Sequence, residues 1–261
     1  VRAVIGELRP DVVAVPAANP YVDYCELHPE ETRRVNVDGT LNLARACRRF
    51  GARLVFFSSD YVFDGAKPAY GEEDTVCPLN EYGRQKAEVE AAVLAASSGN
   101  LVVRTASAYG WQWEPKNFVL QVLRRLKAGE DMKVACDVRV SPTCADNLAE
   151  TVAALVEAGC SGVYHVVGRE RLLRFEFARL AARAFGLDEA RLVPVPFASF
   201  NAPARRPRDA ELLTDKVRAA VSIPLWGAQE GLDGMLRSYA RWRSYAREHL
   251  PASENFPDLI Q

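Results

Sequence analysis

The fold class follows from RLVFFSS, the stretch from Arg53 to Ser59, and from what lies on either side of it. A short apolar run of β-branched and aromatic residues that stops at serine is typical of a buried strand. Further strands are expected at residues 11–18, 101–105 and 162–167, and helices at residues 29–50, 81–94, 117–128 and 174–185. Strands that alternate with helices of ten or more residues predict βαβ units, and hence a Rossmann-like, doubly wound parallel sheet of the α/β class.

The composition is that of a globular protein without a strong charge. The chain has 261 residues, of which 49% are hydrophobic, and a formal net charge of -1. This balance gives no indication of nucleic acid or an anionic membrane as a partner, and no apolar run reaches the roughly 18 residues of a membrane span. The six cysteines are scattered without a C-x-x-C pair, which argues against structural zinc and a disulfide framework. We therefore expect a reduced, cytoplasmic protein without a metal site.

Tyr82 and Lys86 stand four residues apart in the stretch YGRQK, at the start of an expected helix. Residues at i and i+4 share one helix face. The ammonium can therefore lower the pKa of the phenol, about 10 when unperturbed, and make it a general acid. Ser59, at the end of the preceding strand, can donate a hydrogen bond to a carbonyl oxygen. Together the three residues indicate a site for the reduction of a ketone. Coincidence gives such a Tyr–Lys pair with a probability of roughly a fifth, and serine after a strand is also a common turn cap.

Two loops follow strands at the edge of the sheet where ligands bind in open parallel sheets. One is Ala17-Ala18-Asn19, whose small side chains let a flat cofactor approach the backbone. The alternative, at about even odds, is that the alanines only pack closely against a helix. The other loop is Ser58-Ser59-Asp60-Tyr61, which brings the hydroxyl group of Ser59 to the same edge.

A resemblance to a known family is carried by residues 56–90, which read FFSSDYVFDGAKPAYGEEDTVCPLNEYGRQKAEVE. This stretch resembles the extended short-chain dehydrogenase/reductases, and within them the dTDP-4-dehydrorhamnose reductase group. The resemblance covers most of the chain, because it continues at residues 33–44, 140–150, 162–168 and 206–217. It implies an NAD(P)H-dependent reductase of a 4-keto nucleotide sugar, with NADPH or NADH as the hydride donor.

The resemblance also implies a role for each matching residue. Ser59 would hydrogen-bond the sugar ketone, Tyr82 would donate the proton, and Lys86 would lower the pKa of Tyr82 and contact the nicotinamide ribose. Asn36 falls at a helix position that often supports the proton relay. Cofactor contacts are implied for Ala17, Ala18 and Asn19, and substrate contacts for Asp60 and Tyr61.

One departure from the family pattern concerns the cofactor. The chain has no glycine-rich G-x-x-G-x-x-G turn, and its first expected strand matches the family's fourth. We therefore expect either an N-terminally incomplete version of a larger protein, short of about 45 to 55 residues, or a polypeptide that lacks this part. Without the helix N-terminus that neutralises the pyrophosphate, the 261-residue polypeptide alone is expected to bind NAD(P)H poorly.

A second departure concerns the sugar. The family places a tryptophan shortly after an Arg-Thr pair, whereas here Arg104-Thr105 is followed by Ala106-Ser107 and the tryptophans come later, at Trp111 and Trp113. We assign sugar stacking to Trp113, with loop packing as an equally weighted alternative. Arg206 lies in the stretch NAPARRPR and is expected to grip a diphosphate with its guanidinium group. A solvated loop with local ion pairs is the alternative.

Two other functions remain open at this point. The regulatory β subunit of methionine adenosyltransferase also resembles this chain, including SSDYVFDG and a Tyr-x-x-x-Lys pair, so the motif does not separate a reductase from a regulatory subunit. An epimerase or dehydratase of the same superfamily is the third alternative. We expect residues 1–145 to form the dinucleotide-binding core, and residues 146–261 to add the remaining core elements and a small substrate lobe. A homodimer is compatible with the sequence.

Overall fold

The computed structural model describes residues 1–112 and 116–249, which fall into two compact units. Unit 1 comprises residues 1–105, 151–167 and 201–223. Unit 2 comprises residues 106–150, 168–200 and those from 224 onward. The boundary expected at residue 145 falls inside unit 2, and the division into a cofactor core and a substrate lobe stays a prediction.

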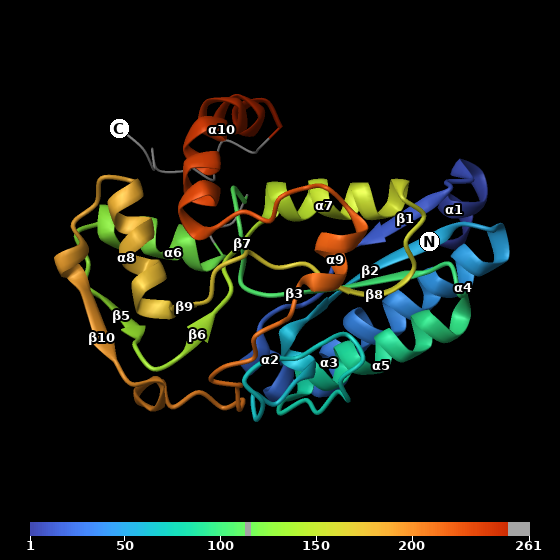
Figure 1. Ribbon diagram of the computed structural model, residues 1–261, viewed down its shortest axis with the longest axis horizontal. Helices are drawn as coiled ribbons and strands as arrows, with labels where there is room; N and C mark the ends of the chain where they lie inside the picture. The colour runs from blue at the N-terminus through green and yellow to red at the C-terminus, as the bar shows by residue number, and fades with distance from the viewer. Residues whose placement is uncertain (113–115, 250–261) are drawn as a thin grey trace. The chain divides into compact units, whose positions relative to one another are not determined.

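Unit 1 contains a parallel sheet of four strands, as predicted. Its strands are β1 (Val12–Val15), β2 (Arg53–Ser59), β3 (Leu101–Thr105) and β8 (Gly162–His165). They lie in the order β1-β2-β3-β8, and every neighbouring pair is parallel (Figure 1). Because β2 and β3 have the predicted bounds, Ser59 is the last residue of its strand, opposite Thr105.

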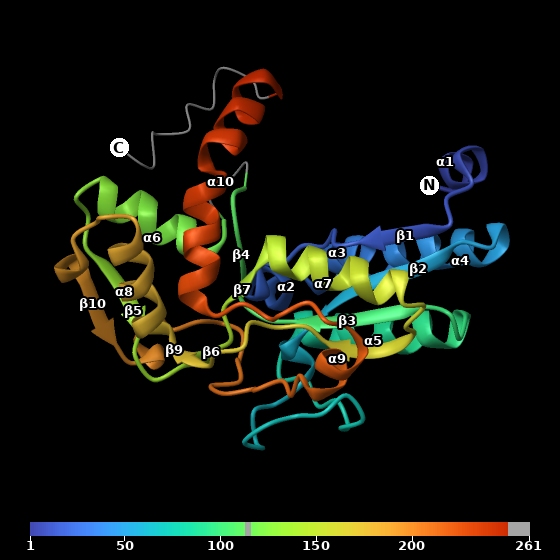
Figure 2. The same ribbon diagram turned by 45° about the horizontal axis from the view of Figure 1, so that its top comes forward.

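Helices cover both faces of this sheet. α4 (Thr40–Phe50) and α5 (Glu81–Ala96) lie over one face, and the part of α7 (Ala145–Glu157) from Thr151 lies over the other (Figure 2). The core between the sheet, α4 and α5 is built from small and branched side chains that alternate with polar ones along the helices. Its fully buried members include Val37, Leu54, Val89, Val93 and Val102.

The expected helix at residues 29–50 is present, with one irregularity. It consists of α3 (Pro29–Arg33), a π-helical turn at Arg34–Gly39, and α4. Such turns are rare and often occur at functional sites. The π-helical turn buries Asn36 and Val37. The other elements of unit 1 are α1 (Arg2–Leu8), α2 (Val22–Leu27), a 3-10 turn at Asp60–Val62, and α9 (Asp215–Ala220).

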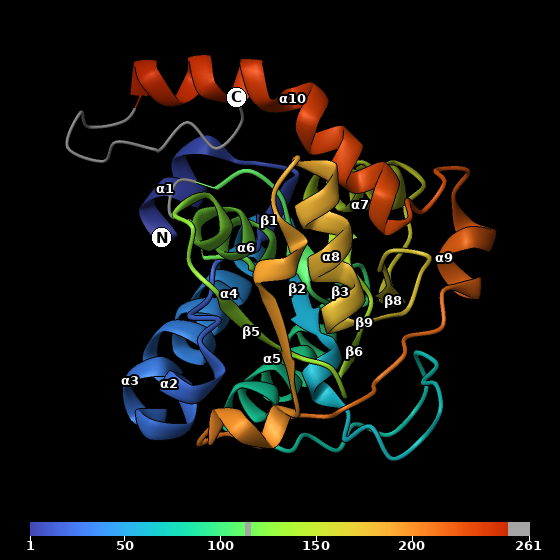
Figure 3. The ribbon, with the colours of Figure 1, turned by 90° about the vertical axis from the view of Figure 1, so that its left-hand side faces the viewer.

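The described residues of unit 2 form three pairs of short strands and three helices that lie wholly within the unit. β5 (Met132–Ala135) pairs with β10 (Leu192–Val195) and β4 (Ala108–Tyr109) with β7 (Thr143–Cys144), both in parallel, whereas β6 (Arg139–Val140) pairs antiparallel with β9 (Leu172–Leu173). The helices are α6 (Phe118–Lys127), α8 (Arg174–Ala184) and α10 (Ala228–His249), with 3-10 turns at Glu189–Arg191 and Phe197–Phe200. α6 and α8 lie beside β5 and β10 (Figure 3).

Two further findings concern residues 1–112 and 116–249 as a whole. No helix within these ranges has both the length and the apolar character needed to cross a bilayer. Within the same ranges, no three His, Cys, Asp or Glu side chains gather in a way that could hold a metal ion.

Candidate active site

Tyr82 lies in the first turn of α5, and neighbouring residues fix where this helix begins. Asn80 caps the helix, because its Oδ1 accepts a hydrogen bond from the backbone N–H of Gly83 at 2.9 Å. There is no room for a side chain at Gly83: a Cβ atom there would overlap the carbonyl oxygen of Tyr61 and lie 2.9 Å from Cβ of Pro78. The glycine therefore lets the first turn of α5 lie directly against the turn that follows β2.

Ser59 ends β2 at this contact and orients its hydroxyl group locally. Its Oγ accepts a hydrogen bond from the backbone N–H of Tyr61 at 3.2 Å and donates one to Oδ1 of Asp60 at 2.8 Å. Ser59 thus caps the 3-10 turn at Asp60–Val62, which is the turn-cap role given above as the alternative to a catalytic one. Its side chain also contacts Tyr82: burial raises the pKa of that tyrosine, and a hydrogen bond with Ser59 opposes this rise. The structure therefore brings Ser59, Asp60 and Tyr82 together at the carboxyl end of β2.

Lys86 lies one helical turn beyond Tyr82 and is 5% exposed. Its Nζ donates a hydrogen bond to the backbone oxygen of Phe57 at 2.7 Å. The same atom lies 4.7 Å from the ring centre of Phe56 and 5.7 Å from that of Tyr82. Burial lowers the pKa of Lys86 to about 8, against the opposing effect of Glu90. The ammonium group is thus held at the site but titrates much closer to neutrality than an exposed lysine.

The structure corrects the expectation that the pKa of Tyr82 is lowered. The pKa of Tyr82 is raised, first because its hydroxyl group is withdrawn from water and then because of the negative charge of Asp60. The ammonium of Lys86 is bound to the backbone of β2, and the pKa of Tyr82 stays above its usual value with this charge nearby. Tyr82 therefore keeps its proton at neutral pH, as a proton donor must. Withdrawal from water also raises the pKa of Asp60 to about 6, so this carboxyl group titrates just below neutrality.

The buried ammonium predicts a stability change that is separate from any activity. Below pH 8 Lys86 is protonated in both the folded and the unfolded chain. Between pH 8 and about 10.5 it is protonated mainly in the unfolded chain, because burial lowers its pKa in the folded one. The free energy of unfolding of the wild type therefore rises with pH across this range, by up to about 3 kcal/mol. Lys86→Met should therefore be at least as stable as the wild type at pH 7 and lose this advantage by pH 10. Urea unfolding at both pH values measures the effect, with Lys133→Met, at an exposed position, as the control. If the difference in the free energy of unfolding between the wild type and Lys86→Met did not change with pH, the pKa of Lys86 would not be lowered by burial.

The loop from Ala17 to Asn19 lies between β1 and α2. Ala17 is exposed and Ala18 and Asn19 are half-buried, so this loop lies at the surface of unit 1. Asn36, in the π-helical turn, holds the loop by two hydrogen bonds: its Oδ1 accepts from the backbone N–H of Asn19 at 2.7 Å, and its Nδ2 donates to the backbone oxygen of Asn19 at 3.2 Å. The role of this loop in binding a cofactor stays a prediction.

Arg206 forms an ion pair within unit 1. Its guanidinium group binds the Asp23 carboxylate through two hydrogen bonds, of 2.8 and 2.7 Å, and the pKa of Asp23 is lowered mainly by this contact. The pair holds the loop at residues 201–208 against α2, and Asn80 holds it to α5 by donating to the backbone oxygen of Arg205 at 2.8 Å. A diphosphate contact at Arg206 stays a prediction.

The tryptophan expected to stack on the sugar, Trp113, lies outside the described residues. Trp111 packs within unit 2: its Nε1 donates to the backbone oxygen of Met235 at 2.8 Å, and its ring stacks on that of Trp242 with 5.2 Å between ring centres. Loop packing, the alternative considered for both tryptophans, therefore describes the contacts of Trp111.

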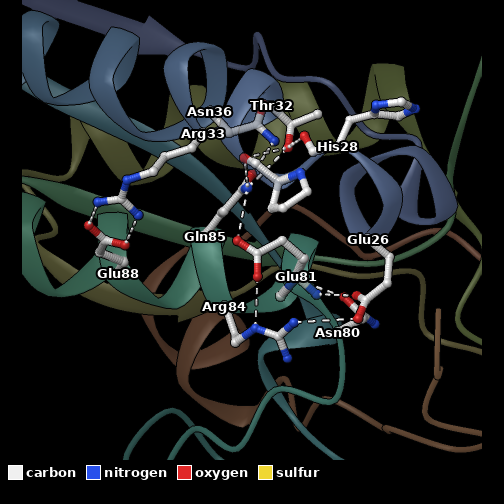
Figure 4. Close-up of polar contacts among 12 residues, drawn as sticks. Glu26, His28, Thr32, Arg33, Asn36, Asn80, Glu81, Arg84, Gln85 and Glu88 are labelled. Atoms are coloured by element: carbon white, nitrogen blue, oxygen red, sulfur yellow. Dashed lines mark hydrogen bonds and ion pairs between the residues drawn. The ribbon is translucent and has the colours of Figure 1, made fainter.

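Sequence reasoning missed three residues that shape the site. Gly83 allows the close approach of α5 to the turn after β2, and Asn80 joins the start of α5 to the loop at residues 201–208. Gln85 is 1% exposed and lies between Tyr82 and Lys86 on the same helix, in hydrogen-bond contact with Asn36 (Figure 4). A signal for Gln85 existed, because an uncharged polar residue at i+3 from Tyr82 shares the face that carries the tyrosine–lysine pair.

The fold and the site together define a class. A parallel α/β sheet, with serine at the end of one strand and a Tyr-x-x-x-Lys pair at the start of the following helix, has the arrangement of the extended short-chain dehydrogenase/reductases. Comparisons with known proteins narrow this class.

Residues 1–241 match the family described as RmlD substrate binding domain, and the chain belongs to this family. The dTDP-4-dehydrorhamnose reductase of Mycobacterium tuberculosis is 38% identical over 252 residues, which cover 94% of this chain and 82% of that protein. The crystal structure of dTDP-4-dehydrorhamnose reductase from Bacillus anthracis, in complex with NADP, matches with a TM-score of 0.84 at 29% identity and covers 91% of this chain and 84% of that one. Methionine adenosyltransferase 2 subunit beta of Bos taurus is 33% identical over 221 residues, which cover 81% of this chain and 65% of that protein.

Proposed function

We propose that this chain is an NAD(P)H-dependent reductase of a 4-keto nucleotide sugar, with dTDP-4-dehydrorhamnose as its substrate. The observation that carries the proposal is the meeting of Ser59, Tyr82 and Lys86 at the carboxyl end of β2, in a chain whose relatives include dTDP-4-dehydrorhamnose reductases. The exact sugar and the choice between NADPH and NADH belong to the proposal.

The roles of the residues follow from their surroundings. A bound nicotinamide would supply the hydride. Tyr82, whose raised pKa keeps its hydroxyl group protonated, donates that proton to the carbonyl oxygen as negative charge develops there. Ser59 hydrogen-bonds the same oxygen once its hydroxyl group turns away from Asp60. The positive charge of Lys86 stabilises the phenolate that Tyr82 leaves behind, and so opposes the larger effect of burial, which keeps the pKa of Tyr82 above its usual value.

The residues at this edge fit the nicotinamide ribose end of such a cofactor. An ammonium group has three N–H donors, and within the described part of the chain Lys86 has one hydrogen-bond acceptor, the backbone oxygen of Phe57. The other two donors would be satisfied by ligand hydroxyl groups, such as those of a ribose. Ala17 is exposed and has a small side chain, which would allow a flat ring to approach. No glycine-rich turn for the pyrophosphate occurs in the 261 residues, so weak NAD(P)H binding by this polypeptide stays our prediction.

The remaining expected contacts are part of the same proposal. Asp60 and Tyr61 would line the sugar pocket beside Ser59, Trp113 would stack on the sugar, and Arg206 would contact the diphosphate while bound to Asp23. A homodimer and a cytoplasmic location are further elements of the proposal.

The proposal is tested by measuring binding and turnover separately. Calorimetric titration first establishes the NADPH and NADH concentrations at which the cofactor is bound to the chain. Oxidation of the reduced nicotinamide is then followed at those concentrations with dTDP-4-dehydrorhamnose. We expect oxidation that depends on the sugar nucleotide. If no oxidation occurs at concentrations where the cofactor is bound, the reductase proposal is wrong.

A second function is favoured by one observation, the match to methionine adenosyltransferase 2 subunit beta. A regulatory subunit would keep the fold and the tyrosine–lysine pair without turnover. In that case the chain should co-purify with a methionine adenosyltransferase and change its kinetics, and it should oxidise no reduced nicotinamide with any 4-keto sugar nucleotide. An epimerase or dehydratase would instead convert the sugar nucleotide without net consumption of the cofactor.

A further inference from the structure

Gln85 joins the face of α5 that carries Tyr82 and Lys86 to the loop that ends at Asn19. Its Oε1 accepts a hydrogen bond from Nδ2 of Asn36 at 2.9 Å. Asn36 in turn holds both the N–H and the carbonyl group of Asn19. Gln85 is 1% exposed and Asn36 is 3% exposed, so water does not replace these contacts. The chain of contacts runs from α5 through the π-helical turn to the loop after β1.

The other end of the Gln85 amide group is anchored as well. Its Nε2 donates to Oγ1 of Thr32 at 3.1 Å, to Oε1 of Glu81 at 3.1 Å and to the backbone oxygen of Pro29 at 3.3 Å. Figure 4 shows the Gln85 side chain pointing toward Thr32 and Asn36, with Glu81 one turn earlier on its own helix. All three partners of Nε2 offer oxygen atoms, so the amide nitrogen must face them.

This set of partners leaves a single orientation for both amide groups. If the Asn36 amide were turned over, its nitrogen would face the N–H of Asn19, and its oxygen would face the oxygens of Asn19 and Gln85. If both amides were turned, the Gln85 oxygen would face the oxygens of Glu81 and Pro29. Either change sets donor against donor or acceptor against acceptor in a buried site, where unpaired polar groups are costly. Gln85 therefore accepts from the Asn36 amide in the same orientation that Asn19 requires, and ties that amide to α5.

We infer that Gln85 is a positioning residue, which sets the loop at Asn19 against Tyr82 and Lys86 through the amide of Asn36. The inference rests on the proposed function for its consequence in turnover, but its structural part does not depend on it. Tyr82, Gln85 and Lys86 occupy positions i, i+3 and i+4, so one helix face holds both the reacting groups and the anchor of the loop. This hydrogen-bonded path would help to keep a cofactor lying on that loop at a fixed distance from Tyr82.

Three variants test the inference. Gln85→Leu removes both ends of the path. Gln85→Glu keeps an oxygen for Asn36 but places a carboxylate against Glu81, so it loses the donor end until the introduced carboxyl group is protonated. Arg84→Gln is the matched control, because Arg84 is the adjacent residue, is exposed, and pairs with Glu81 and Glu26 at the surface (Figure 4). Circular dichroism establishes the folded fraction to which every rate is normalised.

Two readouts are taken from each variant. The first is hydrogen exchange of the Asn19 backbone N–H, which needs no substrate or cofactor; we expect roughly tenfold faster exchange in Gln85→Leu and no change in Arg84→Gln. The second is turnover: kcat of Gln85→Leu should fall by about 10- to 100-fold, with a much smaller change in KM for the sugar nucleotide. Gln85→Glu should recover part of its kcat as the pH falls toward 5, relative to the wild type.

The outcomes separate this inference from the proposed function. Faster Asn19 exchange in Gln85→Leu supports the positioning role even if the wild type reduces no ketone. Asn19 exchange as slow in folded Gln85→Leu as in the wild type overturns it, even if the chain is an active reductase. Equal kcat values for the Gln85 variants and Arg84→Gln in an active enzyme also overturn it. In Gln85→Glu, a pH profile parallel to that of the wild type would show that the donor end of the amide has no positioning role.

Discussion

Tyr82→Phe is expected to lower kcat by about two to four orders of magnitude while leaving the fold unchanged. The substitution removes only the hydroxyl group that donates the proton. The ring keeps its edge-on contact with Tyr61, in which the ring centres are 6.1 Å apart. The raised pKa of Tyr82 shows that the wild-type group is protonated at neutral pH, so the variant loses a proton source that is present throughout the working range. Steady-state oxidation of NADPH measures the loss.

Tyr24→Phe provides the control for this result. The hydroxyl group of Tyr24 donates to Glu31 on the surface, at 2.8 Å, and Tyr24 is not part of the proposed site. This variant should keep wild-type turnover. If Tyr82→Phe turned over at nearly the wild-type rate, another group would have to supply the proton, and the assignment of Tyr82 would be wrong.

Gly83→Ala is expected to lower the free energy of unfolding by about 3 kcal/mol or more, and to abolish turnover in whatever fraction remains folded. The added Cβ would overlap the carbonyl oxygen of Tyr61, which is backbone and cannot turn away as a flexible side chain could. α5 would have to separate from the turn after β2, and Tyr82 would move with it. Urea unfolding followed by circular dichroism measures the stability.

A second glycine shows whether the loss comes from the contact or from the residue type. A Cβ at Gly71 would meet nothing within 4 Å, and its φ is not in the positive range, so Gly71→Ala should change the stability by no more than about 0.5 kcal/mol. If Gly83→Ala were as stable as Gly71→Ala, the close approach of α5 to Tyr61 would not exist in solution.

Much of the sheet of unit 1 could be predicted because its signals are local. The run at residues 53–59 is short, apolar and ended by serine, and β2 has those bounds. β3 also has its predicted bounds, residues 101–105, in a short run rich in β-branched residues. The π-helical turn at Arg34–Gly39 could not be predicted, since one wide turn leaves the apolar spacing of a long helix almost unchanged.

The site was harder to predict because its energetics depend on contacts between distant residues. The pattern placed Tyr82 and Lys86 on one helix face but gave the wrong direction for the pKa of Tyr82. That direction depends on burial against the turn after β2, which Gly83 makes possible. The ion pair between Asp23 and Arg206 joins residues 183 positions apart, and no spacing rule connects them.

The measurement that tests the reductase assignment is the fate of the hydride. NADPH that carries deuterium on the transferable position of its nicotinamide is incubated with the chain and dTDP-4-dehydrorhamnose, and the sugar product is analysed by NMR. We predict deuterium on the carbon that was the ketone. In Tyr82→Phe the amount of deuterated product should fall by the same factor as the turnover. A product without deuterium at that carbon, or unchanged sugar nucleotide in the presence of bound NADPH, would contradict the assignment.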